Sequence, residues 1–305
     1  MLYTNFDDIL KSVENTGVRK KVALVGAEDI HALHAVLNVY EKGLIQPVLI
    51  GDEREIKKGI NKLEAEFTQD IKIYDVKGKE EAAQLGVKFI KSNEADFLMK
   101  GSLETSQLLK AVVDKEKGLY TGAVMSHVAV NQIPSYHKLL VTTDGGMLPY
   151  PTLNQKKYII ENAVNMLHRL GYENPMVGVL AATEKINEKM VETTDAAALK
   201  EMNQSGEIDG CCIEGPISLD LALVKERART KKYESLCAGE ADILVVPNIH
   251  AGNILGKSLV EMAGAKMAGL VLGAECPIIL TSRGSSYEEK FNSLMLACLV
   301  SGKEQ

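Results

Sequence analysis

Short apolar runs alternate with longer amphipathic segments along almost the whole chain. The first strand is predicted over 21–27, and helical spacing follows it from Asp29 to Lys42. The same alternation continues through later apolar runs at 47–52, 71–76, 95–102, 175–183, 241–248 and 268–274. Repeated strand–helix units favour mainly parallel sheets with helices on both faces. The pattern therefore predicts an α/β fold.

The alternation breaks once near the middle of the chain. The runs SHVAVNQI and KLLVTTDGG are separated only by PSYH, which is too short for a crossover helix. We expect the chain to cross between two domains here, and to return near Cys276 and Pro277. This predicts one α/β domain from residues 1–136 plus 277–305, and a second from 137–276.

Composition narrows the class of protein. The 305 residues carry a net charge of −6, so we expect no nucleic-acid partner. Five cysteines without a regular spacing argue against a disulfide framework, and no paired Cys/His spacing predicts a metal site. The sequence shows no apolar run of about 18 residues and no signal-peptide pattern. We therefore expect a cytoplasmic protein that does not enter a membrane.

The last predicted strand ends in a polar turn that suits an anion. The stretch IILTSRGSSYEE places Ser282 and Arg283 between an apolar run and the helical pattern KFNSLMLACLV. Helix N-termini offer unpaired N–H groups, and an arginine fork fits phosphate or carboxylate oxygens. The alternative is that Ser285 or Ser286 caps the helix and Arg283 forms a surface ion pair.

Other polar residues interrupt the pattern where predicted strands end, which is where ligands collect in parallel α/β sheets. The candidate substrate-binding residues are Lys100, Ser102, Thr105, Ser126, His127, Asp144, Asn253 and Lys257. Each also has a structural interpretation, because Asp, Asn and Ser often cap helices or form turns. The nucleophile-elbow, Walker-type and dinucleotide-binding glycine motifs are missing, so an ATPase and a standard Rossmann dehydrogenase are disfavoured.

These loop ends resemble the phosphate acetyltransferase and phosphate butyryltransferase family, over a match from about Lys21 to Gly302. The stretches that carry the resemblance are LMKGSLETSQLLKAVV, SHVAV, VTTDGGM, IEGPISLDLAL, ADILVVPNIHAGNILGKSL and LVLGAECPIILTSRGSSYEEK. The chain lacks the insertions of some acetyltransferases, which favours the butyryltransferase-like branch. The resemblance implies a two-domain fold like that of isocitrate and isopropylmalate dehydrogenases, with the active site in the cleft between the domains, and a dimer or larger homo-oligomer.

The resemblance also implies an activity and its residues. The reaction is the reversible transfer of a short acyl group, butyryl or similar, between CoA and inorganic phosphate, with acyl-CoA as a substrate and no tightly bound cofactor. Ser282 and Arg283 would bind phosphate, and Glu289 is the nearest counterpart of an acidic residue that acts on the CoA thiol. Many butyryltransferase-like relatives have an aspartate where this chain has Ser285, which leaves Glu288 and Glu289 as available carboxylates. Lys110 would match a family arginine with a one-residue offset.

Two other classes stay open at this point. A dehydrogenase of the same fold would use Mg²⁺ and a nicotinamide cofactor on a hydroxy acid, and would need clustered aspartates and several arginines. A non-catalytic anion-binding module would explain Arg283 but would leave the other polar loop ends without a role. CoA-dependent arsenolysis of an acyl phosphate would distinguish a transferase from both.

Overall fold

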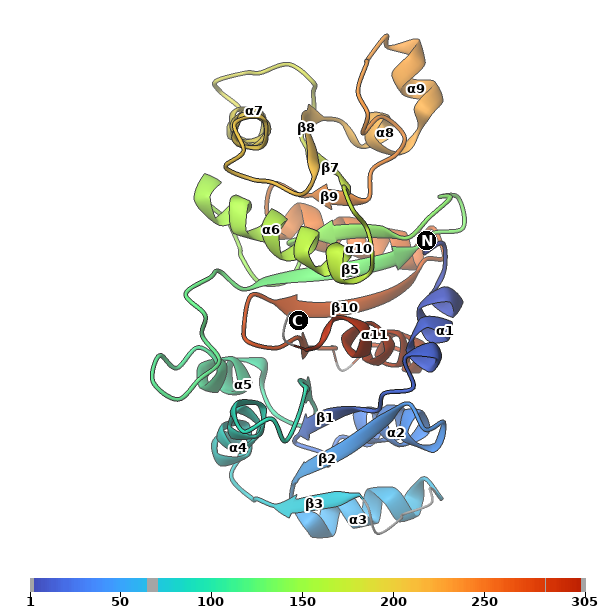
Figure 1. The fold of residues 1–305 in the computed structure, drawn as a ribbon, viewed down its shortest axis with the longest axis vertical. Helices are drawn as coiled ribbons and strands as arrows, with labels where there is room; N and C mark the ends of the chain where they lie inside the picture. The colour runs from blue at the N-terminus through green and yellow to red at the C-terminus, as the bar shows by residue number, and fades with distance from the viewer. Residues whose placement is uncertain (1–2, 65–70, 283, 303–305) are drawn as a thin grey trace. The chain divides into compact units, whose positions relative to one another are not determined.

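A computed structural model describes residues 3–64, 71–282 and 284–302. The chain forms two compact units, each assembled from segments that are distant in sequence. Unit 1 comprises Met1–Phe6 and Val124–Met267, and unit 2 comprises Asp7–Ala123 and Ala268–Gln305. The ribbon of each unit shows strands covered by helices (Figure 1). The predicted α/β class with mostly parallel strand pairing is confirmed.

Unit 2 contains the first four strands and the last two. Its elements are α1 (Phe6–Thr16), β1 (Lys20–Val25), α2 (Ile30–Glu41), β2 (Ile45–Gly51), α3 (Glu53–Lys62), β3 (Lys72–Asp75), α4 (Lys79–Lys91), β4 (Phe97–Lys100), α5 (Thr105–Val112), β10 (Lys266–Leu272), β11 (Ile278–Ile279) and α11 (Tyr287–Val300). The strand order is β3-β2-β1-β4-β11-β10, and all neighbours are parallel except β10 and β11.

Helices cover both faces of the strands in unit 2. Helix α2 packs on α3 and α11, whereas α4 packs on α5. Figure 1 shows these two groups on opposite sides of β1 and β2. Residues 22–25 of β1 are fully buried, as expected for a central parallel strand with helices on both faces.

Unit 1 also has mostly parallel strands, with one antiparallel pair. Its elements are β5 (Ser126–Gln132), β6 (Leu140–Thr143), α6 (Leu153–Arg169), β7 (Met176–Leu180), α7 (Val191–Gln204), β8 (Cys212–Ile217), α8 (Leu219–Leu223), α9 (Lys225–Thr230), β9 (Ile243–Val245) and α10 (Ile249–Glu261). The strand order is β5-β6-β9-β7-β8, and only β5 and β6 run antiparallel.

The observed unit boundaries differ from the domain crossings predicted at 136/137 and 276/277. Strands β5 and β6 pair with each other over Val128–Thr143, so the short connection after β5 is a hairpin inside unit 1. The chain therefore leaves unit 2 before β5, after Ala123. The chain returns to unit 2 after Met267, within β10. Strand β10 then pairs antiparallel with β11 of the same unit. Antiparallel neighbours need only a short turn, so the short connection from which we predicted a crossing is the turn of a hairpin.

Candidate active site

Three turns meet at one edge of the strands in unit 2. Strands β1, β4 and β11 are parallel neighbours, so the turns that follow them start at the same edge. The backbone N–H of Ser102 donates to the carbonyl oxygen of Gly26 at 2.7 Å. A Cβ atom at Gly101 would lie 2.1 Å from that oxygen, so the close contact between the turns requires a glycine.

The turn before α11 holds the predicted phosphate residues. Ser282 lies in it and is exposed, and its N–H donates to the Ser285 hydroxyl at 3.0 Å. The Ser286 hydroxyl caps α11 by accepting the N–H of Glu289 at 3.0 Å. Arg283, the predicted phosphate-binding cation, lies outside the described residues. The sequence alternative of a serine cap is therefore correct for Ser286.

Ser285 and Glu289 form a pair across the first turn of α11. The Ser285 hydroxyl lies 2.7 Å from Glu289 Oε1 and donates to it. Ser282 Oγ lies 3.2 Å from Ser285 Oγ, so a line of polar contacts joins Ser282 to Glu289. The structure thus brings two of the predicted catalytic residues, Ser282 and Glu289, into one hydrogen-bonded chain.

A second network at this edge was not expected from the sequence. Glu28, after β1, accepts the N–H of Asp52 at 2.8 Å, the Ser102 hydroxyl at 2.9 Å and the Lys79 ammonium at 3.2 Å. Burial raises the pKa of Glu28, but these hydrogen bonds outweigh it and hold the pKa below its usual value. Glu28 therefore fixes the position of Ser102, a predicted site residue, and of Lys79. The sequence could have indicated Glu28, because it follows the predicted strand 21–27 just as the candidate substrate-binding residues follow other predicted strands.

Three cavities follow one another along this edge and share lining residues. A cavity of about 10 Å³ is lined by Lys100, Ser282 and Lys290 together with Asp29, His31, Ala32, Gly101 and Thr281. The next cavity, of about 340 Å³, shares Asp29 and Gly101 with the first and includes Ser102 and Lys79. Lys100 and Ser282, both predicted site residues, thus line the same cavity. Thr105, also predicted, is exposed at the start of α5.

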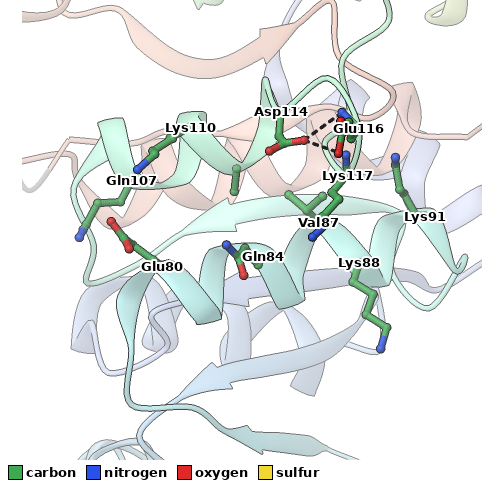
Figure 2. Close-up of a pocket in the computed structure, with 11 residues that line it drawn as sticks. Glu80, Gln84, Val87, Lys88, Lys91, Gln107, Lys110, Asp114, Glu116 and Lys117 are labelled. Atoms are coloured by element: carbon green, nitrogen blue, oxygen red, sulfur yellow. Dashed lines mark hydrogen bonds between the residues drawn. The ribbon is translucent and has the colours of Figure 1, made fainter.

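The third cavity is a groove of about 500 Å³ between α4 and α5 (Figure 2). Four lysines line it, namely Lys88, Lys91, Lys110 and Lys117. Val87 and Ala111 add apolar surface, and Glu80, Asp114 and Glu116 add carboxylates. Asp114 accepts the N–H groups of Glu116 and Lys117 at 2.9 and 2.8 Å. These two backbone donors already stabilise its negative charge. Gln107 lines both this groove and the preceding cavity.

In unit 1, a tight turn after β6 joins three predicted residues. A Cβ atom at Gly146 would lie 2.9 Å from the ring of His127, and one at Gly145 would lie 3.3 Å from the backbone N of Asn253. The Asp144 carboxylate accepts the backbone N–H groups of residues 146, 147 and 148. Burial lowers the pKa of His127 and Asp144 opposes that shift, so the imidazole is held toward its neutral form.

The remaining predicted residues of unit 1 have different surroundings. Ser126 is buried, and its hydroxyl accepts from the Asn162 side chain of α6 at 2.9 Å. Asn253 and Lys257 are exposed on α10, one turn apart. The polar atoms of Ser126 and Asp144 bond within the fold, which favours a role in shaping the loops. A direct contact of these two residues with substrate stays a prediction.

The described residues contain neither a cluster of metal-ligating side chains nor a helix suited to cross a membrane. Within it, no three or more His, Cys, Asp or Glu side chains are grouped so that they could hold a metal ion. None of its helices is both long enough and apolar enough to cross a membrane.

Comparison with known proteins gives the family. Residues 6–85 and 79–298 match the family described as "Phosphate acetyl/butaryl transferase". The chain is 42% identical over 283 residues to a phosphate acetyltransferase of Thermotoga maritima, covering 93% of this chain and 96% of that one. It is 39% identical over 300 residues to a phosphate butyryltransferase of Clostridium acetobutylicum, covering 98% and 99%. The crystal structure of a branched-chain phosphotransacylase from Enterococcus faecalis V583 matches with a TM-score of 0.81 and 31% identity, covering 92% and 99%. The chain therefore belongs to the phosphate acetyl/butyryl transferase family.

Proposed function

We propose that the chain is a phosphate acyltransferase that moves a short acyl group reversibly between CoA and inorganic phosphate. The single observation that carries this conclusion is the family match, which extends over nearly the whole chain. The turn before α11 agrees with the chemistry, because a capped helix N-terminus and neighbouring hydroxyls suit a phosphate. The dehydrogenase and the non-catalytic module stay the alternatives to be tested.

We assign the chemical step to the turn before α11. Ser282 and Arg283 bind phosphate, and one phosphate oxygen attacks the thioester carbonyl carbon. The carbon–sulfur bond then breaks, and the electron pair leaves with sulfur. The Glu289 carboxylate accepts the proton of the attacking hydrogen phosphate and passes it to the CoA thiolate, so no net proton is released. The bond from Ser285 keeps Glu289 oriented for both transfers.

The groove between α4 and α5 is our proposed site for the nucleotide end of CoA. Its volume of about 500 Å³ falls within the range of about 300–1,000 Å³ that is usual for ligand pockets. Lysine ammonium groups attract the CoA phosphates, and Val87 with the lysine stems gives apolar surface for the adenine. Gln107 also lines the neighbouring cavity, which shares Asp29 and Gly101 with the small cavity beside Ser282, so the groove lies near the phosphate turn within one unit.

Acyl-chain length is the finer part of the proposal. The relatives carry both acetyltransferase and butyryltransferase names at nearly equal identity. Each buried methylene contributes about 0.8 kcal/mol, so a fitted pocket would prefer butyryl over acetyl by roughly ten- to a hundredfold. We propose that butyryl-CoA, or a branched acyl-CoA of similar size, is the better substrate.

The decisive experiment measures CoA release from acetyl-, propionyl-, butyryl- and isobutyryl-CoA at fixed phosphate, with arsenate as an alternative acceptor. We expect phosphate-dependent release, arsenolysis of acyl phosphate that requires CoA, and the highest kcat/KM at four carbons. A maximum at acetyl would contradict the chain-length proposal alone. No phosphate-dependent release with any acyl-CoA would contradict the function, and NAD reduction on a hydroxy acid with Mg²⁺ would favour the dehydrogenase.

Three further properties stay predictions from the sequence. These are a homodimer or larger assembly, a cytoplasmic location and no tightly bound cofactor. We also propose that the fold is related to that of isocitrate and isopropylmalate dehydrogenases. The presence of two compact units, each with its own strands and covering helices, supports this relation.

A further inference from the structure

Lys290 is a buried lysine without a carboxylate partner, in the first turn of α11. Its residue is only 3% exposed, and Nζ donates to the Ser285 carbonyl oxygen at 2.6 Å. Among the described residues this is the single hydrogen bond of the ammonium group, and no carboxylate oxygen lies within 4.0 Å of it. A buried ammonium is costly unless it is paired, so Lys290 needs an explanation.

The other buried lysines of the described chain show the usual solution. Lys138 lies 2.6 Å from a carboxylate oxygen of Asp242, and Lys156 lies 2.8 Å from one of Asp195. Both lysines are as buried as Lys290, at 6% and 5% exposed. Lys290 therefore lacks the anion that its two counterparts possess.

The surroundings of Lys290 indicate where an anion would arrive. Lys290 lines the small cavity at the ends of β1, β4 and β11 together with Lys100 and Ser282. That cavity, of about 10 Å³, has room for about one water molecule and is too small for a phosphate ion. Lys290 therefore does not contact a bound phosphate directly. It affects phosphate binding through the turn before α11, whose Ser285 carbonyl oxygen accepts its hydrogen bond.

We propose that Lys290 positions the phosphate-binding turn and supplies positive charge beneath it, so that the incoming phosphate completes the charge balance of the site. The bond to the Ser285 carbonyl fixes the backbone of Ser285, directly before the helix cap Ser286. Ser285 in turn orients Glu289, so the same lysine supports the phosphate residues and the proton carrier. This inference rests on the proposed phosphate acyltransferase function.

Charge removal at Lys290 gives the first test. Lys290→Met keeps the length of the side chain, and we expect the KM for phosphate to rise about tenfold or more, while the KM for acyl-CoA stays within about twofold. Lys290→Arg restores a cation, and we expect its KM for phosphate to lie closer to that of the unmodified chain. Thermal unfolding monitored by circular dichroism accompanies each assay.

Lys156→Met is the matched control, because it removes an equally buried lysine from unit 1 and leaves Asp195 unpaired. We expect it to lower the melting temperature without changing the KM for phosphate. If the control raises that KM as much as Lys290→Met does, or if Lys290→Met leaves it unchanged, the inference is wrong. If the unmodified chain shows no phosphate-dependent CoA release, the proposed function itself fails instead.

A measurement on the unmodified chain covers the case in which Lys290→Met does not fold. Burial lowers the pKa of Lys290, while Glu289 and Asp29 oppose that shift, and Lys100 and His31 also line the cavity. As pH rises, the ammonium should lose its charge below the usual pKa of lysine, and the KM for phosphate should then rise. The rise should be displaced to higher pH in Lys290→Arg. A KM for phosphate that is flat up to pH of about 10 would overturn the inference.

Discussion

The Glu28 carboxylate joins three loops of unit 2, and its neutralisation should destabilise that unit. One of its oxygens accepts the Asp52 N–H, and the other accepts the Ser102 hydroxyl and the Lys79 ammonium. In Glu28→Gln, one amide oxygen can keep the Asp52 bond. The amide NH₂ group then faces the Lys79 ammonium, so the ion pair is lost, and the Ser102 hydroxyl must turn to accept from the amide, which replaces a charge-assisted bond with a neutral one.

The expected magnitude follows from these contacts. A hydrogen bond to a charged group contributes roughly 1.5–3 kcal/mol. The Glu28 side chain is 15% exposed but that of Lys79 is 36% exposed, so water weakens the ion pair. A neutral hydrogen bond contributes roughly 0.5–1.5 kcal/mol, so we expect Glu28→Gln to lower the free energy of unfolding by about 1–2 kcal/mol at neutral pH.

The assay is urea unfolding followed by far-UV circular dichroism, since the chain has no tryptophan. Because the pKa of Glu28 is lower in the folded state, its stabilisation is present above the usual value of 4.5 and is lost as pH falls through the folded value. The difference in the free energy of unfolding between the unmodified chain and Glu28→Gln should therefore reach its full size at pH of about 7.5 and be smaller at pH of about 3.5. Glu53→Gln, which removes an exposed i,i+4 pair with Lys57, should change stability by about 0.5 kcal/mol or less. A Glu28→Gln effect no larger than this control, or one independent of pH, would refute the reasoning.

Three further substitutions test the site and the fold. Arg283→Ala should raise the KM for phosphate about ten- to a hundredfold, and an unchanged KM would remove Arg283 from the phosphate site. Asp242→Asn leaves the buried Lys138 ammonium without a counter-charge, and the one amide oxygen cannot accept from both Lys138 and the Met176 N–H, so it should cost about 3–5 kcal/mol in urea unfolding; a cost below about 1 kcal/mol would show that the pair is dispensable. Gly101→Ala places a Cβ atom 2.1 Å from the Gly26 oxygen and should lower both the melting temperature and kcat, whereas a variant with unchanged values would contradict the close packing of these turns.

The strand–helix alternation was sufficient for the fold class, because each buried parallel strand is a short apolar run. Residues 22–25 and 97–99 are apolar and fully buried, as their pattern predicts. The hairpin of β5 and β6 was harder to place, since a short connector is compatible with a hairpin inside one unit and with a crossing between two. Only the observed pairing of Val128 with Thr143 distinguishes them.

Residues that act through long-range contacts escaped the sequence reasoning. Glu28 contacts Lys79 and Ser102 across 51 and 74 positions, and these contacts depend on the parallel pairing of β1 with β2 and β4, and of β2 with β3. Lys290 was missed for a different reason. A lysine beside two glutamates reads as an exposed helical surface, and its burial depends on the packing of α11 against α2.

Ser285 shows how a departure from the family pattern can fit the chemistry. Where the family resemblance leads us to expect an aspartate, this chain has a hydroxyl that donates to Glu289 at 2.7 Å. An aspartate at that distance would face a second carboxylate and repel it, whereas the hydroxyl satisfies one of its oxygens. The Ser285 carbonyl also accepts the bond from Lys290, and its hydroxyl accepts the N–H of Ser282. One residue therefore connects the buried cation, the phosphate turn and the carboxylate, which favours Glu289 over Glu288 as the proton carrier.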